Sequence, residues 1–212
     1  MSFIEKINPL QLDILKEIGN IGAGNAATAL SAILNRKIDM NVPNVQIVSF
    51  DEMMVMAGGA DHVVASVFLR IEGDASGSMF FVLSLPVAEY LIRQLTGVET
   101  FLIDSTPYNE LALSCLQELG NILSGSYLSS LSDFTRLNIY PSVPSLSIDM
   151  VGASISYGLL GLSQVSDAAI VIDNVLEKDQ LFAESIKGHF FLLPDPDFFD
   201  IIFSALGVSP ND

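Results

Sequence analysis

The chain repeats itself once, and this duplication limits its fold more than any other feature of the sequence. Residues 15–24 read LKEIGNIGAG, and residues 116–125, at an offset of 101, read LQELGNILSG. Pro43 and Pro144 keep the same offset. The two halves therefore derive from one duplicated unit, and we expect each half to fold in the same way.

Two copies are too few for a stacked array of repeats, so we expect them to pair about a pseudo-two-fold axis around one shared core. The prediction is a single domain over residues 1–212, with repeats at about 8–100 and 107–210. Late in the second copy the offset grows by roughly ten residues, which places an insertion at about 173–187. Because that stretch is polar and acidic, it is predicted to be a loop.

Both copies predict the same order of elements. The first copy gives a helix over about 12–35 and then a run over 37–50 of alternating apolar and polar residues, a strand that Pro43 confines to an edge or a bulge. A short helix near 51–57 follows, and then strands over 63–71 and 78–85 that are joined by a glycine turn at 73–77. A helix from Pro86 to Gly97 ends the copy. The second copy gives a helix over 109–134, strands near 145–150, 168–173 and 189–193, and a last helix over 197–206. Strands joined by hairpins indicate an α+β fold with a largely antiparallel sheet, two long helices that bear the repeated motif, and shorter helices packed on it.

The composition excludes several classes of protein. Nine Lys and Arg against 25 Asp and Glu give a net charge of −16, which argues against nucleic-acid binding. Half of the residues are apolar, so the chain can bury a large core. The sequence contains no uninterrupted run of 18 apolar residues, so we expect no insertion into a membrane. No signal peptide is visible and Cys115 is the single cysteine, so we expect a cytoplasmic protein without disulfides.

Polar residues form a narrow stripe on each long helix. Helical spacing places Asp13, Glu17 and Asn20 on one side of the first helix, opposite Leu15 and Ile18, so the polar side chains should point to solvent. The second helix repeats the pattern with Ser114, Glu118 and Asn121. Each triplet allows two interpretations, an ordinary solvated helix face or a functional site.

Glycines in the same helices need a further explanation, because each costs about 1 kcal/mol relative to alanine inside a helix. The first helix carries Gly19, Gly22 and Gly24. They indicate a close approach of the sheet, of the other long helix or of a partner, and the sequence leaves these three possibilities open.

The residue types restrict the chemistry. His62 and His189 are the only histidines and lie outside the repeated motif, so a nucleophilic triad is unsupported, and no cysteine or histidine pair predicts a zinc site. A carboxylate with a neutral amide fits phosphoryl transfer, in which positioning an in-line water is much of the catalytic task.

At these residues the sequence resembles the CheC/CheX/FliY family of phosphatases of bacterial chemotaxis, which hydrolyse the aspartyl phosphate of the response regulator CheY. The family motif is Asp or Ser, three residues, Glu, two residues, Asn, twenty-two residues and Pro. It is present twice, as Asp13, Glu17, Asn20 and Pro43 and as Ser114, Glu118, Asn121 and Pro144. Two complete motifs, in a chain with no room for an additional flagellar-switch domain, indicate the CheC type.

The resemblance implies a hydrolase that acts on phosphorylated CheY. It assigns Glu17 and Glu118 to contact with a lysine of the regulator, and Asn20 and Asn121 to orienting the attacking water. It implies no cofactor of the chain's own, with Mg²⁺ supplied by CheY. Pro43 and Pro144 are expected to support the motif by shaping the neighbouring strand. Asp13 and Ser114, the first residues of the two motifs, are expected to act at the start of the helix or as a polar contact at the rim of the site.

The resemblance also implies a second partner, the receptor deamidase CheD. A candidate contact is Asp149, expected to be an exposed helix cap, for which an ordinary capping role is the alternative. Two other interpretations of the whole chain stay open, an interaction module that mainly sequesters CheD and a structural protein of the flagellar switch. Because the internal duplication can replace a two-fold dimer, we expect a monomer.

Overall fold

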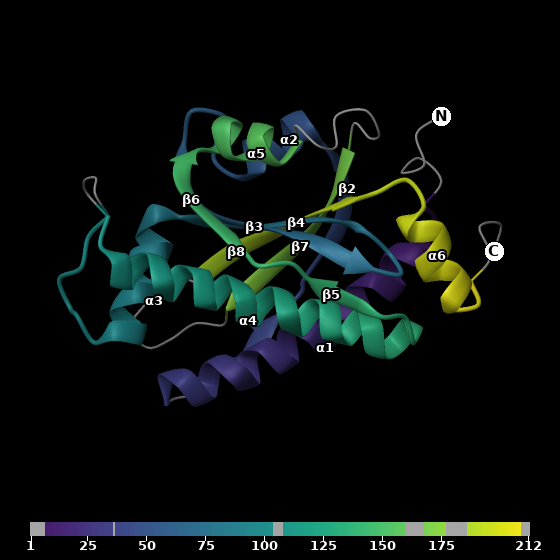
Figure 1. Ribbon diagram of the computed structural model, residues 1–212, viewed down its shortest axis with the longest axis horizontal. Coiled ribbons are helices and arrows are strands. Elements are labelled where there is room, and N and C mark those ends of the chain that lie inside the picture. The colour runs from purple at the N-terminus through teal and green to yellow at the C-terminus, as the bar shows by residue number, and fades with distance from the viewer. Residues whose placement is uncertain (1–6, 36, 104–107, 160–167, 177–185, 209–212) are drawn as a thin grey trace.

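One antiparallel sheet of eight strands runs through the part of the chain that the structure describes (Figure 1). The structure is a computed structural model, and it describes residues 7–35, 37–103, 108–159, 168–176 and 186–208. The helices are α1 (Pro9–Leu34), α2 (Phe50–Met56), α3 (Leu85–Thr96), α4 (Glu110–Thr135), α5 (Val151–Leu159) and α6 (Phe198–Ala205). The strands are β1 (Met40–Asn41), β2 (Val45–Ser49), β3 (Val63–Gly73), β4 (Gly77–Ser84), β5 (Ile139–Pro141), β6 (Ser145–Met150), β7 (Ala168–Leu176) and β8 (Ile186–Pro194). The predicted α+β class with a largely antiparallel sheet is confirmed.

The two halves of the chain exchange strands. The order in the sheet is β1-β7-β8-β4-β3-β5, with β2 also paired to β7 and β6 also paired to β3. Thus β1 and β2 of the first half pair with a strand of the second half, while β5 and β6 of the second half pair with a strand of the first. The equivalent strands β4 and β8 meet in the middle, where the register pairs Phe80 with Phe191 and Phe81 with Phe190. The pairing follows a pseudo-two-fold relation, and each half depends on the other for its outer strands.

The helices cover the sheet unequally. Figure 1 shows the long helices α1 and α4, with α3, on one face and the short helices α2 and α5 together on the other. The larger core lies under the long helices, where Phe190 stacks on Phe81 at 4.6 Å between ring centres and contacts Tyr127 of α4 at 4.8 Å. A smaller core that includes Phe80 and Phe191 lies under α2 and α5. In the described residues no helix is long and apolar enough to cross a membrane.

Most predicted elements are present, and the differences are local. Around Pro43 the predicted strand over 37–50 divides into β1 and β2, both at the β7 edge. The sequence does not predict β5, which has three residues. The prediction of a loop over 173–187 is wrong at both ends, because β7 continues to Leu176 and β8 begins at Ile186; residues 177–185 lie outside the described residues.

The helical glycines fit two of the three expected explanations. A Cβ atom added at Gly22 would lie 3.0 Å from the Cα of Tyr127, so α1 packs closely on α4 there. A Cβ atom added at Gly120 would lie 2.6 Å from Cγ1 of Val67, so α4 packs directly on β3. At Gly24 and Gly125 the same construction meets nothing within 4 Å.

Two glycines of α4 therefore make a matched pair of substitutions. Gly120→Ala is expected to lower the free energy of unfolding by about 1–2 kcal/mol, because the clash with the buried, branched Val67 exceeds the gain in helix propensity. Gly125→Ala is expected to raise the free energy of unfolding by up to about 1 kcal/mol, since space is open there. Urea unfolding of both variants measures the difference, and equal stabilisation by the two would contradict the close contact.

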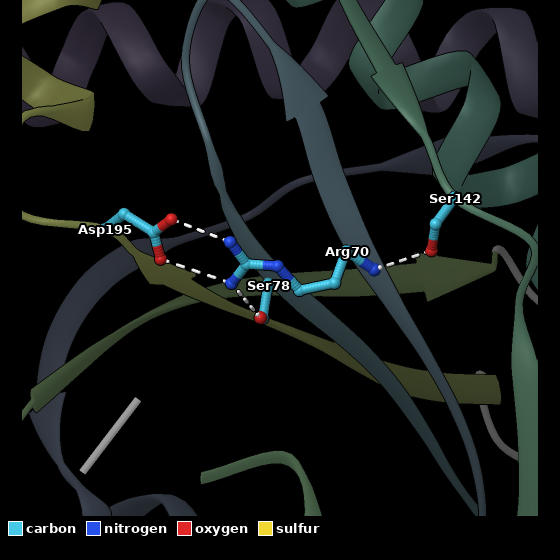
Figure 2. A network of polar contacts seen from close by, with 4 residues as sticks. All are labelled: Arg70, Ser78, Ser142 and Asp195. Carbon is cyan, nitrogen blue, oxygen red and sulfur yellow. Dashed lines mark hydrogen bonds and ion pairs between the residues drawn. The ribbon is translucent and has the colours of Figure 1, made fainter. Parts of the chain in front are cut away.

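Arg70 of β3 joins the two halves through a polar network (Figure 2). Its guanidinium donates to both carboxylate oxygens of Asp195, at 3.2 Å and 2.7 Å, and Nη1 also donates to Ser78 Oγ at 2.8 Å. The backbone N–H of Arg70 donates to Ser142 Oγ at 2.9 Å. Partial burial would raise the pKa of Asp195, but the hydrogen bonds from Arg70 and Ser76 and the charge of Arg70 outweigh it, so this pKa lies below its ordinary value of 3.8.

The ion pair predicts a pH-dependent contribution to stability. Arg70→Met is expected to lower the free energy of unfolding by about 1–2 kcal/mol at neutral pH, since the pair is bidentate but partly exposed. A carboxylate with a depressed pKa stabilises the fold above its ordinary pKa and loses that contribution as the pH falls through the depressed value. Urea unfolding should therefore show the difference between the variant and the wild type narrowing below pH 3.8, with a remainder from the lost hydrogen bond to Ser78.

Arg93→Met provides the control, because Arg93 pairs with Glu89 at a longer 3.5 Å within a single helix. It should cost at most about 0.5 kcal/mol. If the loss in Arg70→Met were the same at neutral and at acid pH, the ion pair with Asp195 would not be its cause.

Candidate functional site

The first motif lies on a helix whose start is well defined. Asn8 caps α1, its side chain accepting from the Gln11 backbone N–H at 2.9 Å while Gln11 Oε1 accepts from the Asn8 backbone N–H at 3.0 Å. From this start the helix turns Asp13 and Glu17 to solvent, while Asn20 is half-buried. The prediction that the polar side chains point to solvent is confirmed for Asp13 and Glu17, whereas Asn20 is more buried than predicted.

The second motif has the same support on α4. Asn109 caps the helix by accepting from the backbone N–H groups of Leu111 and Ala112, at 2.9 Å and 3.3 Å. Ser114, Glu118 and Asn121 are all exposed. The buried side of this helix, which includes Leu116, Leu119 and Leu123, faces the core.

Each motif proline lies in a short loop beside its own motif helix. Residues 42–44, the first proline loop, join β1 to β2, and Asn20 Oδ1 accepts from the Val42 backbone N–H at 2.9 Å. Residues 142–144, the second proline loop, join β5 to β6, and Gln117 Nε2 donates to the Pro144 carbonyl at 2.9 Å. Strands β1 and β2 lie at one edge of the sheet, and β5 and β6 lie at the opposite edge, so the structure carries two separate sites. Asp13, Glu17 and Asn20 form the first site, and Ser114, Glu118 and Asn121 form the second.

The glutamates of both sites are free to meet a cation. Within the described residues, the carboxylates of Glu17 and Glu118 have neither an ion pair nor a hydrogen bond. The described residues also contain no group of three or more His, Cys, Asp or Glu side chains arranged to hold a metal ion. Each site therefore offers an exposed carboxylate and, one helical turn away, a neutral amide.

Asp149 lies away from both sites. It belongs to β6, is exposed, and its Oδ1 accepts from the Met150 backbone N–H at 2.7 Å. The prediction that it caps a helix is wrong, because α5 begins at Val151 and the position before it is Met150. Its exposure is as predicted.

Asp149 lines a pocket of about 360 Å³ on the face of the sheet opposite to the long helices. Its polar wall is a chain of hydroxyl groups, Ser66 Oγ to Ser147 Oγ at 2.9 Å and Ser147 Oγ to Ser154 Oγ at 3.2 Å. Phe68 and Phe80 form part of its apolar wall. No residue of either motif lines this pocket, so it is a surface distinct from the two sites.

The arrangement of a motif helix and a proline loop, present twice on one sheet, defines the class of the protein. The sequence profile of the CheC-like family matches residues 10–47 and 111–148, which is once in each half. The chain is 52% identical over 209 residues to the CheY-P phosphatase CheC of Bacillus subtilis (strain 168), a match that covers 99% of this chain and 100% of that protein. This chain belongs to the CheC-like family.

Solved structures share the fold at lower sequence identity. FliY of Thermotoga maritima has a TM-score of 0.74 at 22% identity, covering 95% of this chain and 98% of that chain. A chain of the CheX-CheY-BeF3-Mg+2 complex from Borrelia burgdorferi has a TM-score of 0.53 at 17% identity, covering 81% of this chain and 96% of that chain. The match to FliY supports the fold over nearly the whole chain.

Sequence reasoning missed two contacts at these sites. The hydrogen bond between Val42 and Asn20 is not visible in the pattern, because its donor is a backbone group. Gln117 does not stand out in the sequence, although it lies directly before Glu118 in the motif helix. The two copies differ at this position, with Lys16 in the first copy and Gln117 in the second, and this difference is a partial sign in the sequence that Gln117 makes a contact of its own.

Proposed function

We propose that this protein hydrolyses the aspartyl phosphate of phosphorylated CheY through its two Glu and Asn pairs. The observation that carries the proposal is an exposed carboxylate with an amide one helical turn away, repeated on α1 and α4, in a chain 52% identical to a CheY-P phosphatase. The similarity to a CheY-P phosphatase supports phosphorylated CheY as the substrate. The exposure of Glu17 and Glu118 supports direct contact between the motif residues and the phosphorylation site of CheY. A group that acts on a phosphate held inside another protein has to project from its own surface.

The glutamates serve as anchors in this proposal. A carboxylate without an internal partner can pair with a lysine beside the aspartyl phosphate of the regulator, and such a charge-assisted contact fixes the orientation of the two proteins. Glu17 has this role in the first site and Glu118 in the second. The Mg²⁺ ion belongs to CheY, and this chain supplies no cofactor of its own.

The asparagines orient the water. Asn20 or Asn121 reaches towards the phosphorus and holds a water by donating and accepting hydrogen bonds, which places the water oxygen in line with the bond to be broken. The water oxygen bonds to phosphorus, the bond from phosphorus to the aspartyl oxygen breaks, and inorganic phosphate and a free carboxylate result. An amide takes up no proton, so the proton of the water passes to phosphate or solvent. A loose transition state needs little more than this.

The first test is the variant that combines Asn20→Ala with Asn121→Ala. It should reduce the acceleration of CheY-P decay by about a hundredfold, because the orientation of the water is lost. Asn121 lies at the surface, whereas Asn20→Ala also removes the acceptor of the Val42 backbone N–H, so the unfolding temperature should fall by a few degrees while the protein stays folded at the temperature of the assay. The measurement is phosphate release from phosphorylated CheY with Mg²⁺.

Asn138→Ala is the matched control. Asn138 is exposed beyond the end of α4, and its side chain makes no hydrogen bond in the described residues. This variant should keep the wild-type rate. Full activity of the double asparagine variant would contradict the assigned role of the amides.

The same proposal includes CheD as a second partner, bound on the face of α2 and α5. Three observations support this surface: Asp149 is exposed, the hydroxyl-lined pocket of about 360 Å³ lies beside it, and the neighbouring Met150 is 45% exposed. An apolar residue beside a carboxylate and a polar pocket is typical of a partner contact. Because the two sites use the opposite face, CheY and CheD could bind at the same time.

We also expect the chain to act as a monomer in the cytoplasm.

Asp149→Asn tests this surface. The substitution should weaken binding of CheD by about three- to tenfold, as loss of an exposed interface charge does, and leave CheY-P hydrolysis without CheD unchanged. Asp133→Asn, at an exposed position on α4, is the control. Calorimetric titration measures both affinities, and an equal affinity of CheD for the two variants would reject the surface.

The alternative function, a module that mainly sequesters CheD, makes a different prediction for the double asparagine variant. If sequestration were the main role, that variant would control CheD fully and the wild type would leave the decay of CheY-P at its intrinsic rate. If hydrolysis is the main role, the variant would bind CheD normally and lose the phosphatase activity.

A further inference from the structure

Two valines at equivalent places in the duplication have opposite surroundings. Val42 and Val143 each stand directly before the motif proline, at the common offset of 101. Val42 is 2% exposed, whereas Val143 is 85% exposed. Identical residues on related backbones therefore contribute to the core in the first site and to the surface in the second.

The packing of the motif helices explains this difference. A Cβ atom added at Gly19 of α1 would lie 3.6 Å from Cγ2 of Val42 and 3.7 Å from Cγ2 of Ile172, so Val42 packs beside Ile172 against α1. The equivalent glycine of α4, Gly120, is so close to Val67 that an added Cβ atom would lie at 2.6 Å. Because α4 rests directly on β3 at this point, Val143 is left outside.

The position of each valine decides the state of the neighbouring asparagine. With Val42 buried, its backbone N–H lies 2.9 Å from Asn20 Oδ1 and holds the amide against the loop. In the second site the loop is held instead by Gln117 and by Arg70, whose backbone N–H donates to Ser142 Oγ at 2.9 Å. Within the described residues the side chain of Asn121 has no hydrogen bond, and it is exposed.

We propose that the two sites are unequal: the second site carries most of the hydrolysis, and Val143 is a docking residue for phosphorylated CheY. The inference rests on the proposed function. An amide that orients water needs its oxygen as well as its nitrogen, and the oxygen of Asn20 already accepts one hydrogen bond at 2.9 Å. Asn121 can reach into a partner without breaking any contact. The contact between Val42 and Asn20 makes the first site a restrained copy.

Val143 extends the second site with an apolar contact. It adjoins Pro144, whose carbonyl is bonded to Gln117, the residue before Glu118. A partner whose lysine meets Glu118 would therefore cover Val143, and burial of an exposed valine strengthens association. The first site has no such contact, because Val42 is inside the core. Val143 is thus a specificity residue of one site only.

The experiment compares single-site variants by steady-state hydrolysis of phosphorylated CheY with Mg²⁺. Asn121→Ala should lower kcat/KM at least fivefold, whereas Asn20→Ala should lower it less than twofold. Equal losses, or a larger loss in Asn20→Ala, would overturn the inference while leaving the proposed function in place. Absence of acceleration by the wild type would instead reject the proposed function itself.

Val143→Ser separates docking from chemistry. It should raise KM about three- to tenfold, as removal of a buried valine side chain predicts, with kcat within twofold of the wild type. Val55→Ser is the matched control, because Val55 is 73% exposed on α2, on the other face. In the Asn121→Ala background, Val143→Ser should have no further effect. An effect of the same size in that background would show that Val143 does not act through the second site.

Discussion

The exchange of outer strands between the two halves is the constraint on which the rest of the structure depends. In the part of the chain that the structure describes, β1 and β2 pair only with β7, and β5 and β6 only with β3. Because β4 and β8 join the halves in the middle, one continuous set of backbone hydrogen bonds holds both copies. This sheet keeps α1 and α4 side by side on one face and places the two proline loops at opposite edges. A half without its partner would leave unpaired strand edges and an uncovered core.

Within that shared frame, the two halves differ where each motif helix meets the sheet. A valine packed against α1 and a direct contact between Gly120 and Val67 are both close-packed solutions, yet they give the neighbouring asparagines different freedom. Duplication within one chain permits such divergence, since one copy can keep a contact that the other lacks. The separate face under α2 and α5 leaves a further surface for a second partner.

The sequence predicts the features that depend on local periodicity. Both long helices, the polar stripes and the ends set by Pro86 and Gly97 follow from spacing and backbone preference, and the structure has them. Strand exchange is not predictable in this way, because it depends on pairing between residues far apart in the chain. The extension of β7 and β8 into the polar stretch is likewise set by partners across the sheet.

The candidate sites show the same division. The exposure of Glu17 and Glu118 follows from helical spacing, and the spacing of the motif is enough to locate both sites on their helices. The opposite burial of Val42 and Val143 could not be predicted, since residue type and position in the repeat are the same. The packing of each motif helix distinguishes them, because Gly19 of α1 lies against Val42 and Gly120 of α4 lies against Val67.

Whether this protein hydrolyses CheY-P is measured by phosphate release from phosphorylated CheY with Mg²⁺ as the wild-type protein is added in increasing amounts. The rate is expected to rise above the intrinsic decay and to saturate, because a complex that positions water at the phosphate forms. A rate that stays at the intrinsic value at every concentration of folded protein would contradict this expectation.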